Sequence, residues 1–195
     1  MGRILLLWVA VLSCACAFAQ DAGVQALLLV ARKDLPDPFF RNAVVLVTNA
    51  TIAPIGVIIN RPLEVKLSKA LPDEKGLALR EEVLFFGGPI EADELVFVFR
   101  AAKPPEEALP IMDGLYFGNS RALLEKMLAR DTPFEGLRIF AGHAGWGPGQ
   151  LEEEIARGDW HLAPADAASV FTAKPEGLWP QLYLRTFATK IRYVQ

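Results

Sequence analysis

The densest group of chemically useful residues lies in one glycine-rich segment of the sequence. Residues 142–149 contain four glycines together with His143 and Trp146, and Gln150 follows directly. A glycine-rich turn that leads into a helix can present main-chain N–H groups to an anion. It can equally be a tight turn whose glycines allow close packing. The segment predicts either a binding loop or a structural turn.

His143 is one of two histidines and the side chain best suited to transfer a proton near neutral pH. If His143 is catalytic, it needs a carboxylate as its partner. Asp37 is the candidate partner, and the protein would then be a hydrolase or a transferase. A hydrogen-bonded structural histidine is the competing interpretation. No G-x-S-x-G motif occurs. His161 does not lie at a zinc-ligand spacing from His143, so we expect no metal site and no cofactor.

Further polar residues and glycines stand where apolar runs end, a position typical of both binding sites and turns. We expect these strand ends to gather on one surface that binds an unknown ligand or protein partner. The predicted binding residues are Asn60, Arg61, Gly87, Gly88, His143, Gly145, Trp146, Gly147 and Gln150.

The elements that must position these residues follow from hydrophobic patterning. Strands are predicted at residues 24–31, 43–48, 56–59, 83–86, 94–100, 112–117 and 137–141. Helices are predicted at residues 67–71, 120–130, 148–157 and 164–171. The pattern of residues 178–195 does not decide between helix and strand. Strands come early and helices late, which favours an α+β fold.

The amino-terminal residues have the pattern of a secretory signal peptide. Arg3 supplies the positive region, residues 4–12 are apolar, and residues 17–19 form a small-x-small cleavage site. The apolar run is far shorter than the roughly 20 residues of a membrane helix. No later apolar stretch in the sequence reaches that length either. We therefore expect residues 1–19 to be removed and the protein to be exported to the periplasm or the exterior, with no transmembrane helix in the mature chain. In the alternative interpretation, Cys14 carries a lipid tether.

Composition limits the partners. The chain has 195 residues, of which 52% are hydrophobic, and a formal charge of −3 that becomes more negative without Arg3. No cluster of lysine and arginine follows the pattern of a phosphate-binding stripe, which argues against nucleic-acid binding. Both cysteines lie within the leader, so cleavage after Ala19 leaves no thiol.

Four linked motifs resemble the YqgE/AlgH family of bacterial proteins. They are Asp37-Pro38-Phe39-Phe40, Gly56-Val57-Ile58-Ile59-Asn60-Arg61-Pro62, Phe86-Gly87-Gly88-Pro89-Ile90, and residues 142–152. The resemblance implies an α+β domain over residues 20–195. In this domain a strongly bent sheet, mixed or antiparallel, approaches a barrel and helices pack outside it. Some members are labelled transcriptional regulators, but the family has no established activity and supplies no catalytic residues. Its members generally lack a leader, and an aromatic residue often stands at the position of His143.

Three functions therefore stay open. The preferred one is an exported, non-enzymatic binding or interaction module. The second is a hydrolase or transferase that uses His143 with a carboxylate. The third is a transcriptional regulator, as the family label suggests.

Overall fold

A computed structural model describes residues 26–48, 53–77, 81–103, 105–112, 114–129 and 136–192, so the predicted signal peptide lies outside the described residues. The strands are β1 (Leu27–Ala31), β2 (Val44–Thr48), β3 (Ile55–Ile58), β4 (Pro62–Lys66), β5 (Val83–Phe86), β6 (Ile90–Arg100), β7 (Leu109–Met112), β8 (Leu115–Gly118), β9 (Leu137–Gly145) and β10 (Trp160–Pro164). The helices are α1 (Leu67–Ala70), α2 (Arg121–Leu128), α3 (Gln150–Ala156), α4 (Ala167–Val170) and α5 (Leu178–Arg192), with 3₁₀ turns at Lys75–Leu77 and Pro175–Gly177.

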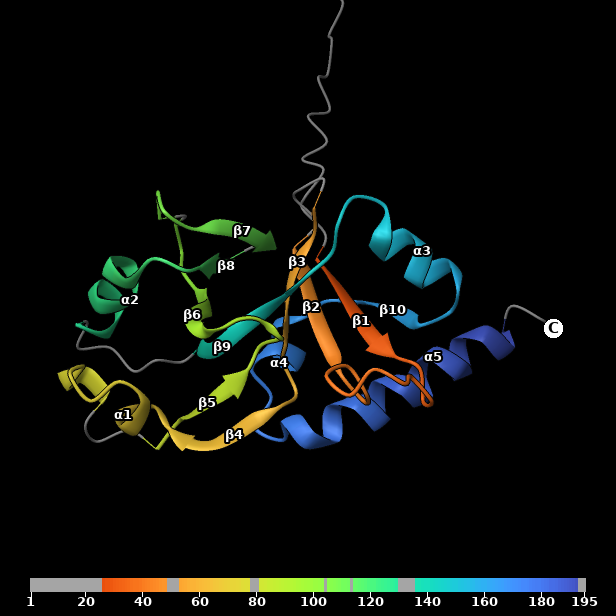
Figure 1. The fold of residues 1–195 in the computed structure, drawn as a ribbon, viewed down its shortest axis with the longest axis horizontal. Helices are drawn as coiled ribbons and strands as arrows, with labels where there is room; N and C mark the ends of the chain where they lie inside the picture. Colours follow the sequence, from red (N-terminus) through yellow and green to blue (C-terminus); the bar gives the residue numbers. More distant parts are fainter. Residues whose placement is uncertain are drawn as a thin grey trace, which may run out of the picture.

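The strands form one curled sheet in the order β10-β1-β2-β3-β9-β6-β8-β7, with antiparallel neighbours (Figure 1). The β4–β5 hairpin joins this sheet through a parallel pairing of β5 with β9. Strand β9 thus contacts β3, β5 and β6. The predicted α+β fold, with a strongly bent sheet and helices outside it, is confirmed.

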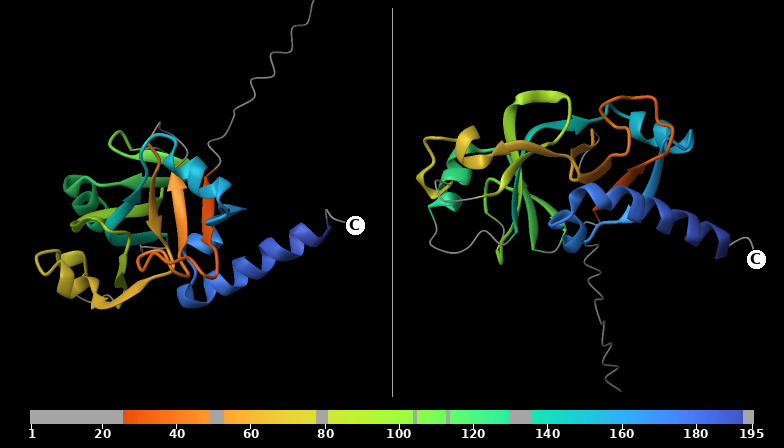
Figure 2. Two further views of the ribbon diagram at one scale, coloured as in Figure 1. Left: turned by 45° about the vertical axis from the view of Figure 1, so that its right-hand side comes forward. Right: turned by 90° about the horizontal axis from the view of Figure 1, so that it is seen from below.

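Both faces of the first strands are buried. Leu28 and Val30 pack with residues of α4 and α5. Leu29 and Ala31 point to the other face and pack with Trp146 and with Leu151, which belongs to α3. Figure 2 shows α5 along one side of the sheet, with its carboxyl end extending beyond the strands. Strands covered on both faces have continuous apolar sequences, and residues 24–31 and 43–48 show this pattern.

A separate cluster joins α2 to the other half of the sheet. Ser120 caps α2 by accepting a hydrogen bond from the main-chain N–H of Leu123. The apolar face of α2 packs on Phe97 and Phe99, which are 1% exposed. The helix predicted at residues 120–130 is confirmed as α2.

Four sequence expectations need correction. Residues 112–117 are not one strand, because Gly114 turns the chain at φ +68° between β7 and β8. Strand β4 was not predicted, and only a helix was expected in this part of the chain. The residues of β4 are half-buried or exposed and therefore lack the apolar pattern of a buried strand. Residues 142–145 continue β9 and are not a loop. The helix expected at residues 164–171 is shorter, because Pro164 ends β10 and Asp166 caps α4.

The described part of the segment that the sequence left undecided, residues 178–192, forms helix α5. Trp179 of this helix donates its indole N–H to the main-chain oxygen of Ala31, which ties α5 to the end of β1. Within the described residues, no helix has both the length and the apolar composition needed to cross a membrane.

Candidate functional site

The glycines of two predicted binding segments meet by direct main-chain contact. Gly87 donates its N–H to the oxygen of Ala141 at 2.8 Å, and its own oxygen accepts from the N–H of Ile58 at 2.8 Å. A Cβ atom at Gly87 would lie 2.2 Å from the oxygen of Gly142, and one at Gly88 would lie 2.2 Å from that of His143. The two segments do meet, but Gly142 and His143 lie within β9 and not at its end. The absence of side chains at Gly87 and Gly88 allows the main chain after β5 to approach β9 so closely.

Asn60 and Arg61 hold the loop that precedes β2. Asn60 Oδ1 accepts from the N–H of Val44 at 2.8 Å, and Asn60 Nδ2 donates to the oxygen of Asn42 at 2.9 Å. Arg61 donates to the main-chain oxygens of Phe39 at 2.6 Å and Arg41 at 3.0 Å. Both side chains therefore form hydrogen bonds within the protein that fix this loop.

The electrostatics of Arg61 agree with this position. Burial lowers the pKa of the Arg61 guanidinium below its ordinary value, against the opposing effect of the Asp37 charge. The guanidinium also lies over the ring of Phe86, 5.8 Å from its centroid. Arg61 thus joins the loop before β2 to the end of β5.

His143 lies on β9 opposite Ile90, with its side chain 15% exposed. The carboxylate beside it is Glu91, whose Oε2 lies 3.8 Å from Nδ1 of His143. Glu91 has φ +49°, an uncommon conformation for a residue with a side chain. The sequence offered Glu91 among the polar residues at strand ends, but Asp37 was the carboxylate proposed as the partner of His143. The irregular pairing between Ile90 and Leu95 brings Glu91 beside His143 instead.

Asp37 belongs to a pocket of about 420 Å³ between the loop that follows β1 and helix α3. Four residues chosen from the sequence line this pocket, namely Asp37, Gly145, Trp146 and Gln150. They come from segments that lie more than a hundred positions apart in the chain. The remaining lining residues are Arg32, Leu35, Pro36, Phe40, Glu154, Arg157, Asp159 and Trp160.

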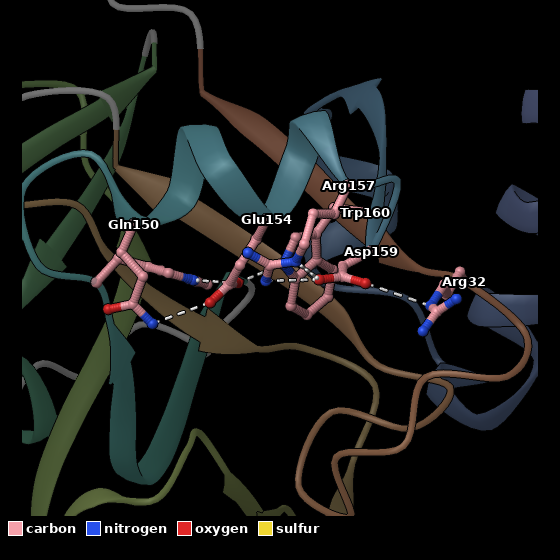
Figure 3. Close-up of polar contacts among 7 residues, drawn as sticks. Arg32, Gln150, Glu154, Arg157, Asp159 and Trp160 are labelled. Atoms are coloured by element: carbon pink, nitrogen blue, oxygen red, sulfur yellow. Dashed lines mark hydrogen bonds and ion pairs between the residues drawn. The ribbon is translucent and has the colours of Figure 1, made fainter.

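Glu154 is the polar centre of this pocket (Figure 3). Its Oε2 accepts the indole N–H groups of Trp146 at 2.9 Å and Trp160 at 2.8 Å, and its Oε1 accepts from Gln150 Nε2 at 2.9 Å. The oxygen of the Gln150 side chain accepts in turn from the N–H of Gly147 at 3.1 Å. Glu154 was not among the predicted residues. Its spacing of four from Gln150 is the signal that could have identified it, because this spacing places both side chains on one helix face.

Aromatic rings support this carboxylate. The ring of Phe40 lies 5.6 Å from that of Trp160 and 6.5 Å from that of Trp146, and the two indoles meet edge to face at 6.3 Å. Trp146 and Trp160 are about 5% exposed, so their N–H groups need internal acceptors and hold Glu154 in one orientation.

Two arginines stand beside the network. Asp159 accepts from Arg157 Nη2 at 2.8 Å and lies 3.3 Å from Nε of Arg32 (Figure 3). Among the described residues, no group of three or more histidine, cysteine, aspartate and glutamate side chains is placed to hold a metal ion.

Fold and site together define an α+β protein in which a curled antiparallel sheet carries a polar, aromatic-lined pocket beside the end of β9. The AlgH-like family model matches residues 28–189, and this chain belongs to that family. The predicted resemblance is thereby confirmed.

Two relatives show how far the likeness extends. A UPF0301 protein of Xanthomonas campestris pv. campestris is 35% identical over 157 residues, covering 78% of this chain and 83% of the relative. A UPF0301 protein of Chlorobium limicola is 32% identical over 155 residues, covering 78% and 81%. Neither name assigns an activity.

Solved structures agree with the fold. The crystal structure of a Corynebacterium diphtheriae protein has a TM-score of 0.69 and 27% identity, covering 83% of this chain and 86% of the other. The solution structure of the AlgH protein from Pseudomonas aeruginosa has a TM-score of 0.67 and 28% identity, covering 83% and 87%.

Proposed function

We propose that this protein is an exported, non-enzymatic binding module whose ligand occupies the pocket around Glu154. The observation that carries the proposal is the meeting of Asp37, Gly145, Trp146 and Gln150 at one cavity of about 420 Å³. A concave site with aromatic walls and a few fixed polar groups is typical of small-molecule binding.

The pocket is held in place before any ligand arrives. Gln150 and the two indoles fix the Glu154 carboxylate, and Arg61 and Asn60 fix the loop that contributes Asp37 and Phe40. A preformed site loses less entropy on binding than a mobile one. Six predicted binding residues do not line the pocket. Asn60, Arg61, Gly87 and Gly88 position the lining segments, and Gly147 donates its N–H to the side chain of Gln150. His143 lies outside the pocket lining, beside Glu91.

Filling the pocket tests the proposal. Small molecules that copurify with the protein from its native host are extracted and compared between the wild type, Gln150→Trp and Glu153→Trp. Gln150 lines the pocket, whereas Glu153 is an exposed neighbour on the same helix outside it. We expect the bound compound to be lost only from Gln150→Trp. Equal recovery from all three proteins would contradict the proposed site.

Export is supported by the leader pattern of residues 1–19. Mass spectrometry of the protein from fractionated native cells is expected to find, in the exported fraction, a chain that begins at Gln20. Lipidation of Cys14 would give a chain that begins at that residue with an added acyl mass. An uncleaved chain in the cytoplasm would contradict export.

One observation favours a second candidate, a hydrolase or transferase that uses His143. The Glu91 carboxylate is 3.8 Å from Nδ1 of His143, close enough to orient the ring after a small movement. Wild type and His143→Ala would be compared on a panel of ester and phosphoester substrates. A turnover that disappears in His143→Ala and falls sharply in Glu91→Gln would favour the enzyme, and identical background rates would remove it.

A further inference from the structure

We infer that the pocket around Glu154 takes an organic cation, a protonated amine or guanidinium with an apolar body. This inference rests on the proposed binding function and names the class of ligand. It depends on how the charges that line the pocket are paired and on the shape of the network around Glu154.

The pocket contains a carboxylate without a cationic partner. Two arginines and three carboxylates line it, and both arginines contact Asp159. Glu154 accepts only neutral N–H donors, and it forms no ion pair within the described residues. One negative charge therefore remains uncompensated beside aromatic walls, and a half-buried charge is most stable with a counter-ion.

Asp37 adds to the negative potential on the loop side. Its Oδ1 accepts the main-chain N–H groups of Phe39 at 2.8 Å and Phe40 at 3.2 Å. Arg61 is near enough for the charge of Asp37 to affect its pKa, but the guanidinium N–H groups are directed at the oxygens of Phe39 and Arg41. An anionic ligand would face both Asp37 and Glu154.

The geometry of Glu154 leaves a place for one more donor. Each carboxylate oxygen can accept about two hydrogen bonds. Among the described residues, Oε2 already accepts from both indoles, whereas Oε1 accepts only from Gln150. An ammonium N–H can take the remaining position on Oε1 without breaking the network.

The aromatic walls explain why the cation should be organic. Phe40, Trp146 and Trp160 line the pocket together with Glu154 and pack against one another. Rings attract weakly hydrated organic cations, whereas inorganic divalent ions need several oxygen ligands. The pocket offers apolar contact for the body of an amine and a fixed charge for its head.

Three small aromatic compounds of similar shape, one cationic, one neutral and one anionic, test the inference. The full-length chain is titrated with benzylamine, benzyl alcohol and benzoate while the indole N–H signals are followed by NMR. Trp146 and Trp160 report on the pocket directly, because both donate to Glu154. Trp179 donates to the oxygen of Ala31 and serves as the internal reference.

We expect benzylamine to shift the signals of Trp146 and Trp160 and to bind about tenfold more tightly than benzyl alcohol, equivalent to about 1.4 kcal/mol. Glu154→Gln should abolish this preference, because glutamine keeps an acceptor oxygen for the indoles but removes the charge. The matched variant Glu153→Gln removes the same charge from the exposed face of α3 and should bind benzylamine as the wild type does.

Other results would overturn the inference. Absence of a benzylamine shift, equal affinity for benzyl alcohol, or unchanged benzylamine affinity in Glu154→Gln would each exclude a cation site. A Trp179 signal at the wild-type position shows that Glu154→Gln is folded. If Glu154→Gln does not fold, Asp37→Asn removes a different negative charge from the pocket and serves as the second test. Tight binding of benzoate or benzyl alcohol would exclude the cation while leaving the proposed binding function intact. That function fails only if the pocket-filling variant Gln150→Trp retains every copurified compound.

Discussion

Replacing Gly87 by alanine tests whether the glycine that follows β5 allows close packing against Gly142 within β9. The new Cβ would lie 2.2 Å from the oxygen of Gly142 and 2.9 Å from Cβ of Phe140, whereas ordinary contacts are 3.4–4 Å. Neither neighbour is the flexible end of a side chain, so β5 and β9 must move apart. The movement would break or stretch two hydrogen bonds, from Gly87 N–H to Ala141 and from Ile58 N–H to Gly87.

The expected cost follows from these contacts. Two main-chain hydrogen bonds contribute about 1 kcal/mol each, and loosened packing around Phe140 adds at least about 1 kcal/mol. Gly87→Ala should therefore lower the free energy of unfolding by about 3 kcal/mol. For a chain of this length, that corresponds to a fall in Tm of about 6–12 °C.

Urea unfolding measures this loss directly, with an unchanged m value as evidence that the denatured state is the same. Two other glycines provide matched controls. A Cβ at Gly177 meets nothing within 4 Å, so Gly177→Ala should leave stability within about 0.5 kcal/mol. Gly149 is equally open but has φ +78°, so Gly149→Ala should cost about 1 kcal/mol through backbone strain alone. If Gly87→Ala were as stable as Gly177→Ala, the packing argument would be refuted.

Three further predictions concern the hydrogen bonds to Glu154, the loop before β2 and binding to duplex DNA. Trp160→Phe removes one of the three donors that Glu154 has among the described residues and leaves a small cavity, so the free energy of unfolding should fall by about 2 kcal/mol in urea titrations. Asn60→Ala leaves the N–H of Val44 without its acceptor and should cost about 2 kcal/mol, with faster limited proteolysis of the loop before β2; unchanged cleavage would contradict the role of Asn60. Fluorescence titration with duplex DNA should show no binding at low salt, because the acidic chain offers no phosphate-binding stripe; salt-dependent binding would revive the regulator hypothesis.

Much of the fold could be predicted because its elements differ in local pattern. Strands β1 and β2 are buried on both faces and produce continuous apolar runs. Helix α2 buries one face and has a serine cap. Strand β4 has no such signal, because it lies at the border of the sheet with half-buried and exposed residues. Its position depends on pairing with β5, which is not a local property of the sequence.

The pocket could be predicted only in part. The glycine-rich segment identified Gly145, Trp146 and Gln150, but the central carboxylate escaped notice. Glu152 and Glu153 occupy the first turn of α3 and are exposed, whereas Glu154 turns toward Trp160. Which of three adjacent glutamates faces inward depends on how α3 docks against β10, and a run of like residues does not reveal this.

The sequence allowed two interpretations of residues 142–149, a structural turn or a binding loop. In the structure, this segment has both a packing role and a place in the pocket lining. The main-chain contact of Gly87 with Gly142 fixes the end of β9, which leads directly into Gly145 and Trp146 at the pocket. Arg61 fixes the loop that carries Asp37 and Phe40 to the opposite wall. Residues that never touch a ligand therefore determine the distance between the two walls. If the pocket binds as proposed, a substitution in this supporting set should weaken binding through the geometry of the walls, even where every lining side chain is retained.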